Sequence, residues 1–188
     1  MKICFFARLL ALLVLLGGLS VLSYAEGWNY RIGEAAPAFK LTSLDGKLVS
    51  LADYRGKIVV MSFMTSWCPF CNAAAPNFYQ IGKQYQDKGV ETLIVDLREE
   101  KGPISEFVKK HNLSCPVVLD TDGKIAERYA PPPTFAPDLM RDSVMVASFL
   151  IIDKQGEIQF LSLNDDTAKF DAKLIKLRAR LDKLLAEK

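Results

Sequence analysis

The sequence predicts an α/β sandwich with a mixed central sheet, and three features of the chain carry that prediction. Short apolar runs typical of buried strands alternate with segments of helical periodicity. An Asp-Gly step lies between two short extended pieces and favours a β-hairpin. The chain closes with two strand-like runs and an amphipathic helix. It shows no internal repeat or low-complexity linker, so one domain is the simplest organisation.

The strands are predicted from runs of apolar and β-branched residues bounded by turn signals. The first two flank the turn Leu44-Asp45-Gly46-Lys47, and the third is an apolar run of the kind found in strands covered on both faces. A turn at Gln155-Gly156 joins the last two. In chain order the predicted strands are Ala38–Leu41, Leu48–Ser50, Ile58–Met64, Glu91–Leu97, Pro116–Leu119, Val144–Asp153 and Glu157–Leu163.

Three segments are predicted to be helical. The first follows Cys68, and Pro69 suits its first turn because proline lacks an N–H that would go unpaired there. The second spans about Pro103–Asn112. The third starts at about Thr167, and its apolar stripe is too short for a coiled coil, so we expect it to pack on the sheet. That stripe consists of Phe170, Leu174, Leu177, Leu181 and Leu184.

The strongest chemical signal is the pair Cys68 and Cys71, separated by Pro69 and Phe70. A cysteine at a helix N-terminus faces unpaired N–H groups, which lower a thiol pKa from about 8.5 to roughly 3.5–7.5. A second cysteine three residues on lies one turn later on the same side and can close a disulfide. The pattern indicates a redox dithiol. The alternative is half of a zinc site, but Cys115 and the single histidine are not spaced as a second ligand pair.

The N-terminus has the pattern of an export signal. Lys2 and Arg8 form a positive region, an apolar run follows, and small residues precede a cleavage site after Ala25. We therefore expect a signal peptide over 1–25 and a domain over 26–188, with an uncleaved membrane anchor as the alternative. Export would place the dithiol in an oxidising, periplasmic or other extracytoplasmic compartment. Without the signal peptide the domain has 22 basic and 22 acidic residues, so no nucleic-acid partner is expected.

These motifs together resemble the thioredoxin superfamily, in particular the exported TlpA/ResA-like thiol–disulfide oxidoreductases with their AhpC/TSA-like redoxin domain. The resemblance covers essentially all of 32–187. It implies a thioredoxin-like three-layer sandwich, with helices on both faces of the mixed sheet and an N-terminal β-hairpin. It is carried by Gly33-x-x-Ala36-Pro37-x-Phe39-x-Leu41, Leu51-x-Asp53-Tyr54-Arg55-Gly56-Lys57, Ser66-Trp67-Cys68-Pro69-Phe70-Cys71, Pro76, Phe107 to Asp120, and Phe149-Leu150-Ile151-Ile152-Asp153.

The resemblance also implies roles for individual residues. Cys68 would attack a substrate disulfide and Cys71 would resolve the mixed disulfide, so that a Cys68–Cys71 disulfide forms. The helix position agrees with these roles, because Cys68 is expected at the exposed helix end and Cys71 deeper, under Trp67 and Phe70. Ser62 stands where thioredoxins have a buried Asp, and the spacing makes Glu99 the candidate acid/base, unless Glu99 belongs to a solvated charged turn. No cofactor and no metal is expected. The residues expected to contact a protein client are Trp67, Pro69, Phe70, Val146 and Ala147.

The chain departs from the family in two places. Ala147, preceded by Val146, stands where the family has a cis-proline facing the dithiol, and this puts ordinary client docking in doubt. A proline-rich insertion occupies about 130–143. Our hypothesis is that it borders the active site, with Phe135 or Met140 as contacts, and the alternative is a surface excursion without a role.

The function predicted from the sequence is an exported thiol–disulfide oxidoreductase that exchanges disulfides with protein clients. The resemblance implies apocytochrome c among the clients and a membrane thiol electron donor, while the direction of electron flow stays open. One alternative is a peroxiredoxin-like peroxidase with antioxidant activity. It would need a proline at Met61 and an arginine near Ala147, although Thr65 is in place. The other is a Sco-like copper-binding protein, for which His111 lies in the wrong element. Cys115 is expected to be a buried small hydrophobe.

Overall fold

A five-stranded mixed sheet forms the centre of the protein in the computed structural model, which describes residues 31–130, 148–162 and 170–187. The strand order is β5-β4-β3-β6-β7. The first three of these pair in parallel, whereas β6 runs antiparallel to β3 and β7 antiparallel to β6. The strands are β3 (Ile58–Met64), β4 (Val90–Leu97), β5 (Val117–Asp120), β6 (Ser148–Ile152) and β7 (Ile158–Ser162).

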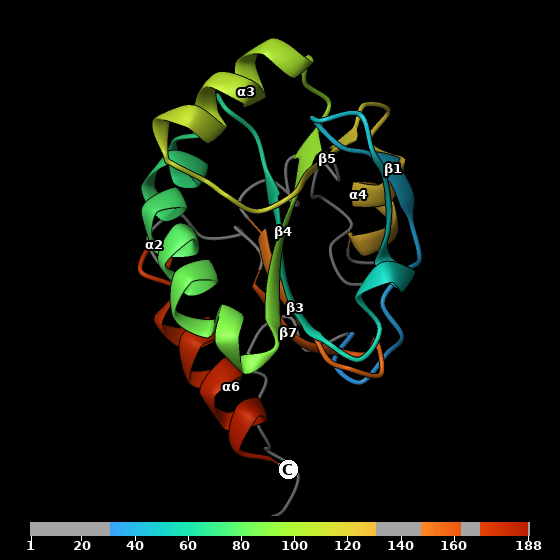
Figure 1. The fold of residues 1–188 in the computed structure, drawn as a ribbon, viewed down its shortest axis with the longest axis vertical. Coiled ribbons are helices and arrows are strands. Elements are labelled where there is room, and N and C mark those ends of the chain that lie inside the picture. Colours follow the sequence, from blue (N-terminus) through green and yellow to red (C-terminus); the bar gives the residue numbers. More distant parts are fainter. Residues whose placement is uncertain (1–30, 131–147, 163–169, 188) are drawn as a thin grey trace, which may run out of the picture.

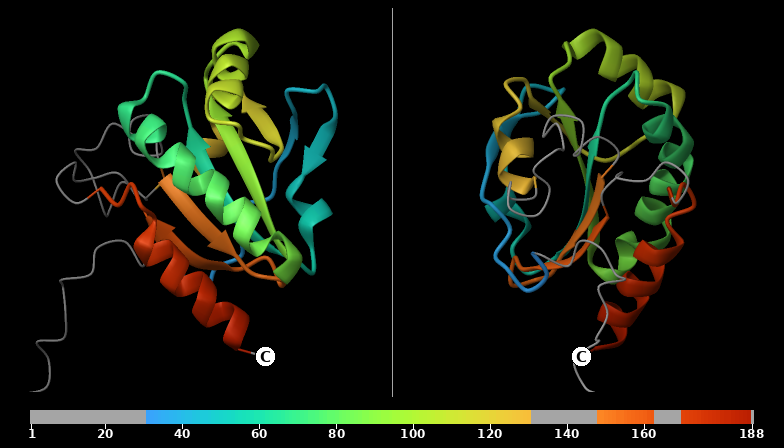
Figure 2. Two further views of the ribbon diagram at one scale, coloured as in Figure 1. Left: turned by 60° about the vertical axis from the view of Figure 1, so that its left-hand side comes forward. Right: turned by 180° about the vertical axis from the view of Figure 1, so that it is seen from behind.

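Helices cover both faces of this sheet (Figure 1). One face carries α2 (Pro69–Tyr85) and α6 (Ile175–Ala186), with α3 (Lys101–Lys110) beyond the N-terminal end of α2. The other face carries α4 (Lys124–Tyr129), and the two views of Figure 2 show the same division into layers. The predicted thioredoxin-like three-layer sandwich is therefore confirmed. None of the helices in the described residues is long and apolar enough to cross a membrane.

Every residue of β3 is buried because its two faces pack against different layers. Phe63 points toward α4, where its ring lies 5.3 Å from that of Tyr129. Its neighbour Ser62 pairs in register with Phe149, whose ring lies 6.1 Å from that of Phe78 in α2. Since successive residues of a strand alternate between faces, Ser62 and Met64 face the α2 layer.

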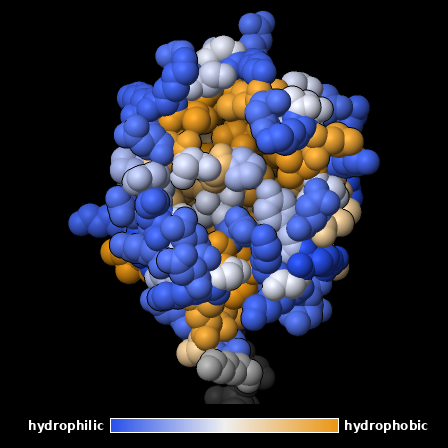
Figure 3. Space-filling view, viewed as in Figure 1, coloured by the Kyte–Doolittle hydropathy of each residue, from blue (hydrophilic) through white to orange (hydrophobic). Residues whose placement is uncertain are grey.

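The predicted hairpin consists of β1 (Lys40–Thr42) and β2 (Leu48–Ser50), and a short 3₁₀ helix, η1 (Leu51–Tyr54), follows it. Its turn contains Gly46, whose φ of +84° is readily adopted only by glycine. The hairpin lies along the outer edge of β5, the first strand in the sheet order, where the Leu44 N–H donates to the Val117 carbonyl at 2.9 Å. Figure 3 shows hydrophobic residues gathered on this side of the molecule. The hairpin thus covers part of an edge strand that would otherwise be open to other chains.

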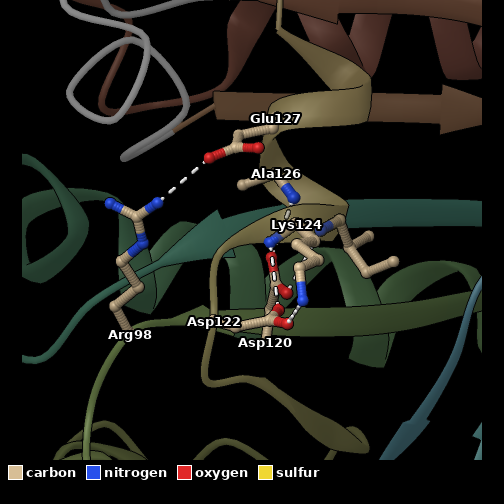
Figure 4. A network of polar contacts seen from close by, with 7 residues as sticks. Arg98, Asp120, Asp122, Lys124, Ala126 and Glu127 are labelled. Atoms are coloured by element: carbon tan, nitrogen blue, oxygen red, sulfur yellow. Dashed lines mark hydrogen bonds and ion pairs between the residues drawn. The ribbon is translucent and has the colours of Figure 1, made fainter.

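The short helix α4 was not predicted, and a side-chain network explains why it forms (Figure 4). The buried Asp120 carboxylate at the end of β5 accepts the N–H groups of Ile125 and Ala126 at 3.2 and 2.8 Å. Gly123 precedes the helix with a φ of +74°, and a side chain there would collide with Arg98. A six-residue helix is too short to show helical periodicity in the sequence, so tertiary contacts decide it.

Most predicted boundaries differ from the observed ones by a few residues at element ends. The C-terminal helix is the larger correction, because within the described residues it begins at Ile175 rather than near Thr167. Leu174 has a left-handed φ of +55°, and Phe170 lies before the helix, packed against Phe70 with ring centroids 5.0 Å apart. The expected signal peptide, nearly all of the insertion, Val146, Ala147 and Thr167 lie outside the described residues.

Candidate active site

The two cysteines lie together at the N-terminus of α2, where the chain leaves β3. Cys68 is the N-cap residue, and its sulfur accepts the N–H of Cys71 at 3.5 Å. The sulfur of Cys71 in turn accepts the N–H of Thr65, also at 3.5 Å. Both cysteines are free thiols in the structure. Each sulfur therefore receives a backbone hydrogen bond that can stabilise negative charge on it.

The surroundings of Cys68 favour its thiolate. A hydrogen bond from the Cys71 side chain lowers the pKa of Cys68 to about 6, and the backbone N–H groups of Cys71 and Phe70 add to the effect against the opposing influence of burial. Burial is greater than the sequence suggested, because Cys68 is only 3% exposed and Cys71 is 0% exposed. The Cys68 sulfur was expected at an exposed helix end, but it is almost fully buried.

The neighbouring aromatic residues differ in how they sit around the dithiol. Trp67 is 67% exposed, so most of its surface faces solvent rather than covering Cys71 as expected. Phe70 is partly buried and held by Phe170, which comes from the segment before α6. Pro69 occupies the first turn of α2, as predicted. An exposed tryptophan beside a reactive sulfur offers a large apolar contact for a partner.

Glu99, the predicted acid/base, follows β4 and contacts the turn between β3 and α2. Its carboxylate accepts both the N–H and the hydroxyl of Ser66, each at 2.5 Å. Ser66 directly follows Thr65, whose N–H contacts the Cys71 sulfur. Two consecutive backbone N–H groups, those of Thr65 and Ser66, therefore contact the Cys71 sulfur and the Glu99 carboxylate. Glu99 is half-buried between the exposed Arg98 and Glu100, and its carboxylate is held by Ser66.

A second carboxyl group at this end of the sheet was missed in the sequence. Asp96 lies in β4, is 1% exposed, and pairs in register with Met64 at the end of β3. Burial raises the pKa of Asp96 to about 8, and a hydrogen bond with Glu99 and the charges of Glu99 and Asp120 act in the same direction. An aspartate inside the apolar run of β4 was the available signal, because buried strands rarely carry an unpaired charge.

Asn72 was also missed, although this residue of α2 joins the turn that carries Cys68 to the end of α3. Its amide nitrogen donates to the carbonyls of Ser66 and Cys68 at 2.9 and 3.0 Å. Its amide oxygen accepts a hydrogen bond from Lys110 at 2.9 Å and lies 3.1 Å from the ring nitrogen of His111. These contacts fix the turn that carries Cys68 and anchor it to the end of α3. No sequence signal distinguishes such an asparagine from an ordinary helical one.

Replacing Asn72 by alanine should loosen this turn. We expect the pKa of Cys68 to rise by about half a pH unit to one pH unit, since a net hydrogen bond contributes about 0.5–1.5 kcal/mol. The pH dependence of Cys68 alkylation measures the change. Asn77→Ala is the matched control, because Asn77 lies in the same helix but donates to the Ala172 carbonyl beside α6. An equal rise in both variants would contradict the assignment.

The remaining polar candidates lie elsewhere. Cys115 is half-buried before β5, and burial raises the pKa of its thiol to about 12. His111 follows α3 as its C-cap residue, and its ring nitrogen lies 3.1 Å from the Asn72 amide oxygen. Burial lowers the pKa of His111, with Lys110 adding to the effect. Ser62 donates to the Ser148 carbonyl at 3.0 Å and is buried without a titratable group of its own.

Comparison with known proteins agrees with this geometry. A model of the AhpC/TSA family matches residues 32–161. The thiol–disulfide oxidoreductase ResA of Bacillus thuringiensis subsp. konkukian is 33% identical over 156 residues, which cover 80% of this chain and 83% of that protein. Among solved structures, a secreted disulfide oxidoreductase of Mycobacterium tuberculosis homologous to E. coli DsbE is 28% identical, with a TM-score of 0.60 over 77% of this chain and 95% of its own.

The thioredoxin domain of a thiol–disulfide oxidoreductase from Bacteroides vulgatus has the same fold, with a TM-score of 0.64 at 20% identity over 82% of this chain and 97% of its own. Fold, dithiol and relatives together define a thiol–disulfide oxidoreductase with a thioredoxin-like domain. The chain belongs to the AhpC/TSA family, and within it to the ResA-like oxidoreductases. The resemblance predicted from the sequence is confirmed.

Proposed function

We propose that this oxidoreductase exchanges disulfides with protein clients, with Cys68 as the attacking thiol and Cys71 as the resolving thiol. The observation that carries the proposal is the position of Cys68 as N-cap of α2, where its pKa is lowered to about 6. At neutral pH most of this thiol is then thiolate, which is the nucleophilic form. Cys71 is fully buried behind it and is reached by Cys68 rather than by a client.

The exchange has two steps in the reducing direction. The Cys68 thiolate attacks one sulfur of a client disulfide, a mixed disulfide forms, and the other client sulfur leaves as a thiolate with the electron pair. Cys71 then loses its proton and attacks the Cys68 sulfur. The Cys68–Cys71 disulfide forms and the second client sulfur leaves as a thiolate. Two electrons have passed to the client, and the reverse sequence oxidises a client dithiol.

Glu99 is the proposed acid/base for the proton of Cys71. Its carboxylate is hydrogen-bonded to Ser66, one residue from the N–H that contacts the Cys71 sulfur. A carboxyl group held beside a thiol can accept the proton when the disulfide closes and return it when the disulfide opens. Within the described residues, the proposed client contacts are Trp67, Pro69 and Phe70. Val146, Ala147 and the 130–143 insertion would complete it.

The proposed setting is extracytoplasmic. Residues 1–25 would act as the signal peptide of a domain over 26–188, and the secreted Mycobacterium tuberculosis relative supports export. ResA-like proteins suggest a membrane thiol donor as the source of electrons and apocytochrome c as a client. An oxidising compartment makes such a donor necessary if the dithiol works as a reductant.

Alkylation of the reduced protein tests the proposal. Iodoacetamide should modify Cys68 with a pH midpoint near 6 and faster than free cysteine at pH 6.5. Mild oxidation should join Cys68 to Cys71 in a peptide map. Cys115 is the internal control, because its pKa of about 12 keeps it unreactive over the same range. If neither thiol of the pair outpaces free cysteine and no disulfide forms between them, the proposal is wrong.

A further inference from the structure

Asp96 is a buried carboxyl group without an ordinary partner. It is 1% exposed, and neither of its carboxylate oxygens accepts a hydrogen bond from a donor group in the described residues. The hydroxyl of Thr65 is buried in the same way, without a partner in that part of the chain. Leaving such groups unpaired is costly, so their presence calls for a reason. Both lie at the carboxyl ends of neighbouring strands, and the N–H of Thr65 contacts the Cys71 sulfur.

The side chain of Asp96 faces the layer that contains Cys71. Asp96 pairs in register with Met64, and Met64 shares its face of β3 with Ser62, whose register partner Phe149 packs on Phe78 in α2. The group that acts on Asp96 there is the Glu99 carboxyl, whose hydrogen bond and charge both raise the pKa of Asp96. Two carboxyl groups in contact can form a hydrogen bond only if one of them carries a proton. A hydrogen bond between the Asp96 and Glu99 carboxyl groups therefore requires a proton held between them.

We propose that Asp96 and Glu99 act as one proton-sharing pair for the resolving thiol Cys71. Asp96 stores the proton, and Glu99 is hydrogen-bonded to Ser66, next to Thr65, whose N–H contacts the Cys71 sulfur. This inference rests on the proposed function and assigns Asp96 a positioning role that acts through Glu99. Such a pair loses its last proton in a macroscopic step that belongs to both groups. The raised pKa of Asp96, about 8, places that step close to the range of thiols. A group whose pKa lies near that of its partner exchanges protons efficiently in both directions.

The proton balance follows from the second step of the exchange. When the pair has lost both protons, it accepts the proton of Cys71 as Cys71 attacks the Cys68 sulfur. The Cys68–Cys71 bond forms, the Cys68–client bond breaks, and the client sulfur takes the electron pair. When a donor thiolate reopens the disulfide, the singly protonated pair returns its proton to the Cys71 thiolate.

The electrostatic surroundings of Asp96 are one-sided in the described part of the chain. Glu99 comes from the segment after β4 and Asp120 from the end of β5, and both charges raise its pKa. The α2 layer contributes the thiols. The buried residues of α3 are Ile104 and Phe107, which are apolar. Burial, reinforced by the neighbouring carboxylates, thus keeps the proton on Asp96.

The small aromatic disulfide dithiobis-nitrobenzoate allows the attack by Cys68 and the resolution by Cys71 to be measured separately. The full-length protein carrying Cys4→Ser and Cys115→Ser, reduced and mixed with dithiobis-nitrobenzoate, releases one nitrothiolate as Cys68 attacks and a second as Cys71 resolves. In this protein without a further substitution, the rate of the second release should increase as the pH rises through about 8. With Asp96→Asn that inflection should disappear, and at pH 8 the second release should slow by about tenfold or more. The rate of the first release should still depend on pH with a midpoint near pH 6.

Asp120→Asn is the matched control. Asp120 is a second buried aspartate at a strand end, but it contacts α4 on the opposite face of the sheet. This variant should keep the inflection, displaced to lower pH because one charge acting on Asp96 is gone. Asp96→Asn combined with Glu99→Gln should slow the second release no further than the slower single variant, since the two residues act as a unit.

Two outcomes overturn the inference. One is a second release that is unchanged or faster in Asp96→Asn at every pH. The other, which does not depend on any variant folding, is a carboxyl carbon of Asp96 in the reduced protein that titrates below pH 5 by NMR. Failure of the proposed function looks different, because the first release would then be no faster than that of free cysteine.

Discussion

Replacing Cys71 by serine should trap clients on Cys68 and abolish turnover. Without the resolving thiol, the mixed disulfide formed by Cys68 has no intramolecular exit, so it accumulates. Serine keeps a hydroxyl that can donate to the Cys68 sulfur, which preserves part of the hydrogen bond that lowers the pKa of Cys68. We expect multiple-turnover reduction of a protein disulfide to fall by roughly three orders of magnitude. Mixed disulfides between Cys68 and client proteins should appear on non-reducing gels and disappear when a reductant is added.

Two variants control this experiment. Cys68→Ser should form no adducts, because Cys71 is 0% exposed and cannot reach a client. Cys115→Ser should behave like the unmodified protein, since Cys115 is half-buried before β5 and its thiol stays protonated. Adducts on Cys71 in the Cys68→Ser variant would reverse the assigned roles. If the Cys71→Ser variant formed no adducts, protein disulfides would be excluded as its substrates.

The sequence was sufficient for the elements that local patterns encode. The apolar run of β3 was predicted with its observed bounds, Ile58–Met64, because a strand buried on both faces needs no polar positions. Pro69 and Cys68 likewise defined the start of α2. Helix α4 was not predicted because its stability depends on a tertiary contact. The Asp120 carboxylate accepts backbone N–H groups five and six residues further along the chain. Periodicity carries no trace of such a contact.

Burial and partnership at the site could not be predicted. Trp67 was expected to cover the dithiol, yet it faces solvent, and Cys68 was expected to be open, yet it is covered. Both depend on how the turn after β3 packs, and spacing does not specify this. Glu99 was found through its position after β4, whereas Asp96 was read as part of the strand. Its importance comes from the register with Met64, which only the folded sheet establishes.

Asp96→Asn should make the protein more stable at neutral pH while slowing the resolving step. The pKa of Asp96 is about 8 in the folded protein and about 4 in an unfolded chain, so folding takes up a proton between these values. The folded state therefore benefits fully from this group below pH 4 and loses that benefit as pH rises toward 8. Asparagine does not titrate. Its advantage should be near zero at pH 4 and should grow to at most about 4 kcal/mol at pH 7.

Urea unfolding of the reduced protein at several pH values measures this difference. Asp122→Asn is the control, because Asp122 is an exposed aspartate whose pKa is lowered by Lys124, so its loss should bring no stabilisation. A difference for Asp96→Asn that does not change with pH would show that the carboxyl is not buried as a protonated group. A buried acid that weakens the fold at the pH where the enzyme works is explained by a function that needs its proton. Greater stability and slower resolution in the same variant would establish that relation.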